Sequence, residues 1–496
     1  MSVSFSRRAA LAALAASVAA PAFAGAPASS LFPRARGERP APPALPEGGA
    51  LVERARIPGA TGFAVADAAT GEMLESHAET TALPPASVAK ALTAGYALEF
   101  LGRDHRFETR LLTTGTLSEG VLTGDLILAG GGDPTLDTDA VAELARRLKA
   151  AGVSQVTGAL HVWGGALPRL KTIDPEQPDH VGYSPAVSGL NLNYNRVHFE
   201  WRRSGSEYTT SLEARSETLR PAVRMARMRI EDRSLPVYTY ADRAGRDDWT
   251  VARGQLGKGG ARWLPVRKPE LYAGEVFQSL AGAQGIKMGA PEVIETLPEG
   301  AEELAKIESR PLAKIVNEML LYSTNLTAEV LGLSATVKRS ISCETLADSA
   351  QALNLWANSV LGTRAVALAD HSGLGDDSRV SAADMVRALI AMRERVDLAP
   401  LLKRIKTGEP PKGVPSVPVT VRAKTGTLNF VSGLGGFETL PDGRVLAFAI
   451  FSGDLDRRAG IPRAQRERPD GARGWASRAR SLQKDLLALW GARYSA

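Results

Sequence analysis

The sequence is poor in the residues that build disulfides and metal centres. Its 496 residues include one cysteine, Cys343, which excludes an intrachain disulfide and a metal site built on cysteines. The six histidines are scattered, and none belongs to an HExxH pattern. The net charge is only +6, and basic residues do not interleave with aromatic ones, which make up 6% of the chain. These absences argue against metal catalysis and nucleic-acid binding, and we expect no cofactor.

Apolar runs long enough to cross a bilayer are lacking as well. The apolar stretch Ala9–Ala20 follows Arg7 and Arg8 and precedes Ala22-Phe23-Ala24. It is too short for a transmembrane helix, but it has the charged, apolar and A-x-A regions of a secretory signal. We therefore predict a signal peptide over residues 1–24 and a periplasmic mature protein with no membrane span. The Sec and twin-arginine routes both remain open.

The length of the chain and the changes in residue pattern along it indicate several domains of the α+β class. Residues 25–50, rich in Pro, Gly and Ala, read as a flexible lead-in. Residues 51–105 and 305–496 carry alternating strands and periodic helices, which predict one discontinuous domain with an antiparallel sheet flanked by helices. Residues 106–304 between them are rich in loops and short strands, and we expect an inserted region of one or two small domains.

Two copies of Lys-Thr-Gly stand close together near the end of the chain. The first, Lys406-Thr407-Gly408, follows a stretch that reads as helical and runs into Glu-Pro-Pro-Lys. Proline has no amide to donate, so we expect a loop there. The second, Lys424-Thr425-Gly426, ends an alternating strand pattern and continues into Thr427. A strand edge can receive an extended peptide, so the second copy is predicted to be the functional one.

A Ser-x-x-Lys pattern, Ser87 to Lys90, opens a predicted helix over residues 86–102. Residues three apart share a helix face, which brings the serine hydroxyl and the lysine amine within reach. Burial and the positive helix terminus both favour a neutral amine, which can accept the serine proton. The amide of Ser87 can bind an oxyanion. Apolar residues at every fourth position predict one buried side for this helix: Val88, Leu92, Tyr96 and Phe100.

A third element, Ser323-Thr324-Asn325, lies in a predicted turn between two helices. Alone it could be an ordinary helix cap, and a Ser and a Lys three positions apart often occur by chance. The order S-x-x-K, S-x-N, K-T-G-T, on a helix, a turn and a strand, is a much more specific combination. It indicates a serine nucleophile with a lysine base.

At these residues the sequence resembles the active-site serine penicillin-recognising enzymes, which share the serine transpeptidase and β-lactamase fold. More narrowly, it resembles the low-molecular-mass class C penicillin-binding proteins, the D-alanyl-D-alanine carboxypeptidase/endopeptidase family. Ser323 lies 233 positions after Lys90, and a large insert at that place is characteristic of this family. Four further segments are similar to family segments: "GGGDPTL" (130–136), "SPAVSGLNLNYN" (184–195), "ESRPLAKIVNEMLLYSTNLTAE" (308–329) and "DHSGLG" (370–375).

The resemblance implies a substrate, partners and a role for each motif residue. Peptidoglycan stem peptides and cross-links would be the substrates, and β-lactams would be inhibitors that acylate Ser87. Lys90 would be the base, Ser323 a proton relay, and Asn325 an orienting group. The substrate-binding residues would be Lys424, Thr425, Gly426 and Thr427.

The sequence departs from the family pattern at two places, one of them at the predicted rim of the cleft, and two other functions stay open. Thr324 stands where Asp is common, which matters little because its side chain is assigned no chemical step. Residues 401–418 differ from the family segment before the third motif, and this difference leaves substrate preference undecided. A β-lactamase or esterase on the same scaffold is one alternative, and the long insert argues against it. A non-catalytic peptidoglycan-binding protein is the other. The balance between carboxypeptidase and endopeptidase activity is also open.

Overall fold

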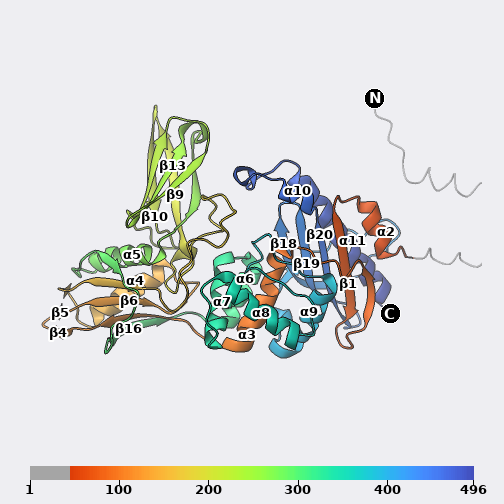
Figure 1. Cartoon of the computed structure of the whole chain (residues 1–496), viewed down its shortest axis with the longest axis horizontal. Coiled ribbons are helices and arrows are strands. Elements are labelled where there is room, and N and C mark those ends of the chain that lie inside the picture. Colours follow the sequence, from red (N-terminus) through yellow and green to blue (C-terminus); the bar gives the residue numbers. More distant parts are fainter. Residues whose placement is uncertain (1–44, 496) are drawn as a thin grey trace, which may run out of the picture. The chain divides into compact units, whose positions relative to one another are not determined.

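A six-stranded antiparallel sheet lies toward the right of Figure 1, which shows the computed structural model; the structure describes residues 45–495. The predicted signal peptide and most of the lead-in lie outside the described residues. The strand order is β17-β18-β19-β20-β1-β2, so the first hairpin of the described chain completes a sheet built mainly near its end. The strands are β1 (Ala60–Asp67), β2 (Met73–His77), β17 (Lys403–Ile405), β18 (Thr420–Leu428), β19 (Val431–Thr439) and β20 (Val445–Gly453).

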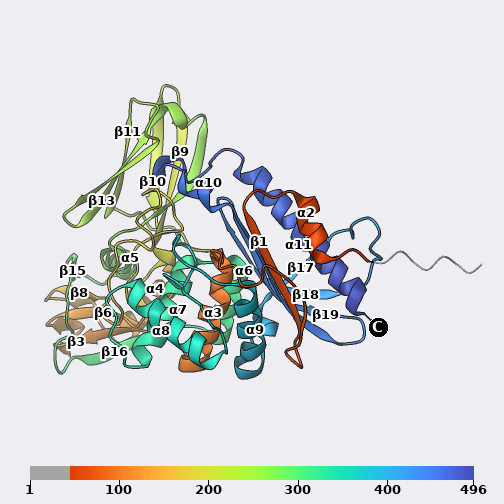
Figure 2. The ribbon, with the colours of Figure 1, turned by 45° about the vertical axis from the view of Figure 1, so that its right-hand side comes forward.

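Helices cover both faces of this sheet. On one face α2 (Gly48–Ala55) lies beside α11 (Ala472–Tyr494) (Figure 2). On the other are α3 (Ala89–Leu101), α6 (Leu312–Tyr322), α7 (Asn325–Lys338), α8 (Leu346–Val360) and α9 (Ala382–Val396). A short 3-10 turn, η1 (Ala86–Val88), precedes α3, and α10 (Leu455–Ala459) follows β20. Because α2 begins at Gly48, the last residues of the predicted lead-in are helical.

Both faces of the sheet are buried. Because successive side chains of a strand point to opposite faces, each strand contributes residues to two separate hydrophobic cores. Phe63 and Val65 of β1 point to the core under α2 and α11, whereas Ala64 and Ala66 point to the core under α3 and α9. With helices on both faces, the inner strands β1 and β20 are apolar almost throughout.

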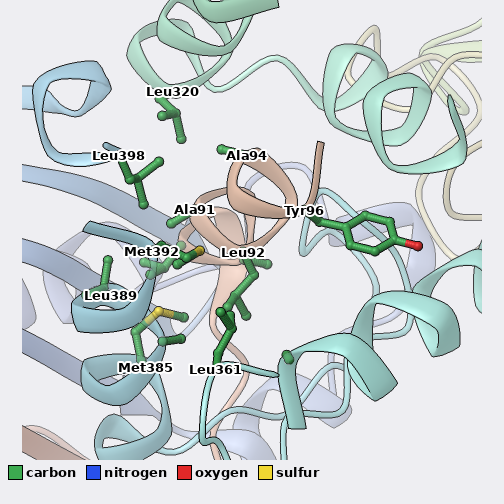
Figure 3. Packing of buried hydrophobic residues seen from close by; sticks show 14 of the residues in the cluster. Ala91, Leu92, Ala94, Tyr96, Leu320, Leu361, Met385, Leu389, Met392 and Leu398 are labelled. Atoms are coloured by element: carbon green, nitrogen blue, oxygen red, sulfur yellow. The ribbon is translucent and has the colours of Figure 1, made fainter. Parts of the chain in front are cut away.

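Helix α3 is buried on all sides, which corrects the expectation of a single buried side. Every residue from Ala89 to Leu98 is buried, because α6, α7, α8 and α9 surround the helix. Figure 3 shows Leu320, Leu361, Met392 and Leu398 around it. Small residues allow this close approach: a Cβ on Gly95 would lie 2.2 Å from the sulfur of Met392. The helix that carries the Ser-x-x-Lys pattern is therefore rigidly held.

Residues between α3 and α6 build their own sheets. A five-stranded sheet has the order β15-β8-β6-β3-β16, and α4 (Thr138–Ala150) and α5 (Pro269–Ala283) share a hydrophobic core with it. Its strands are β3 (Glu108–Thr113), β6 (Leu126–Gly130), β8 (Leu160–Trp163), β15 (Pro291–Val293) and β16 (Glu302–Glu308).

Three smaller sheets, each of three strands, complete the described chain. They are β4 (Thr116–Ser118), β5 (Val121–Thr123) and β7 (Gln155–Val156); β9 (Arg196–Ser204), β10 (Glu207–Glu213) and β14 (Gly259–Pro265); and β11 (Ala226–Glu231), β12 (Tyr238–Arg243) and β13 (Arg246–Ala252). The six-stranded antiparallel sheet and the helices packed on it confirm the predicted α+β class. No helix within residues 45–495 has the length and apolarity needed to span a bilayer.

Candidate active site

Ser87 and Lys90 meet where η1 runs into α3, as the Ser-x-x-Lys spacing predicts. Lys90 is fully buried, and its Nζ lies 2.9 Å from Ser87 Oγ. The same amine contacts Asn325 Oδ1 at 2.8 Å and the carbonyl oxygen of Ser372 at 2.7 Å. Ala86, just before the serine, has φ of 47°, a left-handed conformation that costs an alanine roughly 1–2 kcal/mol. The surrounding packing therefore holds Ser87 in a strained turn.

The Ser323-Thr324-Asn325 turn connects α6 to α7, as predicted. Ser323 ends α6 in a left-handed conformation, and Asn325 is the first residue of α7. Ser323 Oγ accepts a hydrogen bond of 2.9 Å from Lys424 Nζ. Besides its contact with Lys90, Asn325 donates from Nδ2 to the backbone carbonyl of Tyr183, at 2.9 Å. One turn thus links Lys90, Lys424 and the region between α3 and α6.

The second Lys-Thr-Gly lies on β18 beside η1. Lys424 is buried, while Thr425 and Thr427 are exposed. Strand β17 pairs with β18 only as far as Ala423, so within the described chain the outer edge of residues 424–428 has no strand partner. A Cβ on Gly426 would lie 2.6 Å from the carbonyl oxygen of Pro85 and 3.0 Å from the amide nitrogen of Ser87. Only glycine permits this approach of the strand to the serine turn.

The first Lys-Thr-Gly lies in a loop, as expected, but the element before it differs. Lys406-Thr407-Gly408 directly follows the short strand β17, where the sequence reads as helical. Pairing with β18 overrides the local pattern over those three residues. Of the two lysines, the structure brings Lys424 to the serine motifs.

Burial controls the charges at the site. It lowers the pKa of Lys424 to about 6, and the nearby charges of Lys90 and Lys403 act in the same direction. Burial also lowers the pKa of Lys90, whereas the carboxylates of Glu329 and Asp370 oppose that effect. Both lysines are thus biased toward neutral amines, and a neutral amine can act as a base.

A cavity of about 420 Å³ opens onto these groups. Ser87, Ser323, Asn325 and Thr427 line it, whereas Lys90 and Lys424 lie behind them. Its remaining lining residues are Gln177, Tyr183, Gly373, Leu374, Asp376, Leu428, Asn429, Arg458, Ile461, Arg466, Glu467, Ala472, Arg473, Ala476 and Arg480. A bound peptide would meet the serine hydroxyl and the open strand edge together. Within residues 45–495, His, Cys, Asp and Glu form no group of three or more that could hold a metal ion.

Reasoning from sequence missed several residues of the site, among them Glu329, Asp370 and Tyr183. Glu329 and Asp370 lie within segments that resemble the family, but their residue types alone suggest no role. Tyr183 participates through its backbone carbonyl, for which no side-chain signal exists.

A model of the D-Ala-D-Ala carboxypeptidase 3 (S13) family matches residues 50–470. The D-alanyl-D-alanine carboxypeptidase of Actinomadura sp. (strain R39) is 28% identical over 441 residues, which cover 81% of this chain and 79% of that protein. The D-alanyl-D-alanine carboxypeptidase DacB of Haemophilus influenzae is 25% identical, with 80% and 86% covered.

Solved structures show a similar fold. Penicillin binding protein 4 (dacB) from Haemophilus influenzae matches with a TM-score of 0.70 at 20% sequence identity, covering 89% of this chain and all of that one. The same protein in complex with a β-lactam matches with a TM-score of 0.66.

Proposed function

Because the chain belongs to the D-Ala-D-Ala carboxypeptidase 3 (S13) family, we propose that Ser87 is the nucleophile of a D-alanyl-D-alanine carboxypeptidase/endopeptidase. The family match confirms the resemblance to the class C penicillin-binding proteins. It also confirms the activity that this resemblance implies, as an activity of the family. The observation that carries the residue assignment is the buried Lys90 amine, 2.9 Å from Ser87 Oγ.

The first step forms an acyl-enzyme. Ser87 Oγ attacks the carbonyl carbon of the penultimate D-Ala, and its proton passes to the neutral amine of Lys90. The carbonyl oxygen becomes an oxyanion, which the amides of Ser87 and Thr427 stabilise. The close approach that Gly426 permits supports this pairing of amides from η1 and β18. Loss of one such donor typically slows the reaction about 10²- to 10³-fold.

The leaving group departs with a proton supplied through Ser323. Its hydroxyl lies between Lys424 and the cavity, where it can relay a proton to the departing amine. Asn325 holds the Lys90 amine and can orient the substrate amide. In its ammonium form, taken up with a proton on binding, Lys424 binds the terminal carboxylate by charge-assisted hydrogen bonds, together with the hydroxyls of Thr425 and Thr427. Gly426 contributes the strand edge along which the peptide lies. Water then hydrolyses the acyl-enzyme.

Carboxypeptidase and endopeptidase reactions use the same groups, because both cleave a bond that follows the same D-Ala carbonyl. β-Lactams enter as mimics of the substrate and acylate Ser87. Turnover tests this function: a pentapeptide ending in D-Ala-D-Ala should release D-Ala, and purified cross-linked fragments should report endopeptidase activity. Ser87→Ala should abolish both. Faster turnover of a chromogenic cephalosporin than of either peptide would favour a β-lactamase, and inertness toward all three would favour a binding protein.

The region between α3 and α6 positions the second motif. We propose that residues 106–304 form an inserted region and infer that one role of its Tyr183 carbonyl is to hold the Asn325 amide. Displacing this loop should then impair the site without touching Ser87 or Lys90. Deletion of the loop around Tyr183 should lower the rate of Ser87 acylation, and an unchanged rate would contradict this role.

The mature protein is proposed to work in the periplasm after export with cleavage following Ala24. The charged, apolar and A-x-A regions at the start of the sequence support this. N-terminal sequencing of the protein recovered from the periplasmic fraction should begin at Gly25. Retention of full-length protein in the cytoplasm would contradict the proposal.

A further inference from the structure

Behind Lys90 lies a buried carboxyl group that the proposed steps do not use. Glu329 of α7 has no solvent exposure. Its Oε2 accepts the amide of His371 and its Oε1 the amide of Ser372, both at 2.9 Å. These hydrogen bonds offset the cost of burying the carboxyl group. Buried titratable groups with perturbed pKa values cluster at functional sites, so a position beside the base suggests a function for Glu329.

A single peptide unit joins Glu329 to Lys90. The amide of Ser372 donates to Glu329, and the carbonyl of the same residue accepts from Lys90 Nζ at 2.7 Å. Asn325, which also contacts that amine, lies one helical turn before Glu329 on α7. Residues four apart share a helix face, so α7 presents both groups toward the base.

The charged and titratable groups around Lys90 come from three elements besides its own. Helix α7 supplies Glu329; the loop that follows α8 supplies Asp370 and His371; and β18 supplies Lys424. Asp370 is buried and accepts the amides of Ser372, Gly373 and Gly375. Burial lowers the pKa of His371 to about 3, so this ring is neutral and adds no charge.

We propose that Glu329 is a positioning residue for Lys90: its carboxyl group anchors the Ser372 peptide that holds the amine, and its charge sets the pH at which the amine becomes a base. This inference rests on the proposed role of Lys90. Burial raises the pKa of Glu329 to about 8, the range in which Lys90 loses its proton, so the two groups titrate together. The Glu329 carboxylate, once formed, favours the ammonium form of Lys90 and delays its activation as the pH rises. Removing that charge should let the amine lose its proton at lower pH.

The test is the pH profile of acylation by a fluorescent penicillin in Glu329→Gln, with wild type beside it. The acidic limb of the second-order acylation rate should move by about 1 to 3 pH units toward lower pH. Well below the wild-type limb, the rate relative to the plateau should rise at least about tenfold. Glu438→Gln is the matched control, because it removes a buried carboxyl group that faces α11 on the opposite side of the sheet and should leave the limb in place.

A purely structural role predicts a different result. Glu329→Gln would then lower the acylation rate equally at every pH and leave the limb unmoved. That outcome would overturn the inference. The proposed function would still stand if the fluorescent penicillin labels the wild-type protein. Unlabelled wild type would instead overturn the proposed function. If Glu329→Gln does not fold, Asp370→Asn removes the second carboxylate that acts on Lys90 and should move the limb in the same direction. An unmoved limb in folded Asp370→Asn would equally overturn the inference.

Discussion

Glu438 should make the protein less stable as the pH rises, and its replacement by leucine should remove that loss. The side chain belongs to β19 and has no solvent exposure. Among the described residues, neither carboxyl oxygen has a hydrogen-bond partner. A Cβ on Gly491 of α11 would lie 3.2 Å from Oε1, which places the carboxyl group within the packed layer between sheet and helix. Burial raises its pKa to about 8.

The sign and size of the effect follow from this pKa. In the unfolded chain the carboxyl group ionises near pH 4.5, whereas in the folded protein it keeps its proton to about pH 8. The folded state is therefore favoured most below pH 4.5, and that advantage is lost as the pH rises through 8. At roughly 1.4 kcal/mol per pH unit, the loss amounts to at most about 5 kcal/mol.

The assay is the free energy of unfolding from urea titrations between pH 4 and pH 9. Glu438→Leu, compared with wild type, should show a stability difference that grows in the mutant's favour above pH 4.5 and levels off above about 8. Glu438→Gln is the matched neutral variant and should show the same pH dependence with a lower baseline, because it buries an unpaired amide. A difference that stays constant across this range would refute the reasoning.

Three further predictions concern the site. Gly426→Ala should slow acylation at least about 100-fold in stopped-flow measurements, because its methyl group would lie 2.6 Å from the Pro85 carbonyl and push β18 away from the Ser87 amide; a rate within threefold of wild type would contradict this. Burial and the charge of Lys90 hold the pKa of Lys424 near 6, so affinity for a peptide carboxylate should fall as the pH rises above 6, and calorimetry should detect proton uptake on binding. Affinity independent of pH between 5 and 8 would exclude this account. Ser323→Ala should lower the acylation rate more than the affinity for the same peptide, and equal losses would instead assign Ser323 to binding.

Local pattern was sufficient to predict the three motifs and their elements. Ser87 and Lys90 come together because the i, i+3 spacing requires it on a helix. The alternation of apolar and polar residues predicts the strand β18. The break between two helical patterns predicts the turn at Ser323. The antiparallel sheet and its helices, and hence the α+β class, were predictable from the same periodicities.

Tertiary contacts explain what the sequence did not predict. Helix α3 is buried on every side because four helices surround it, and no pattern within the helix reveals their positions. Glu329 and Asp370 bind backbone amides of a loop, and Tyr183 acts through its carbonyl, so none of them carries a signal in its residue type. The strand β17 forms only because β18 offers it an edge.

The central claim is that Ser87 is an acylating nucleophile activated by Lys90. Intact-mass measurement after incubation with benzylpenicillin, followed by peptide mapping, tests it most directly. The account predicts one penicilloyl group on the peptide that contains Ser87, absent in Ser87→Ala. An adduct on another residue, or an adduct retained in Ser87→Ala, would contradict it.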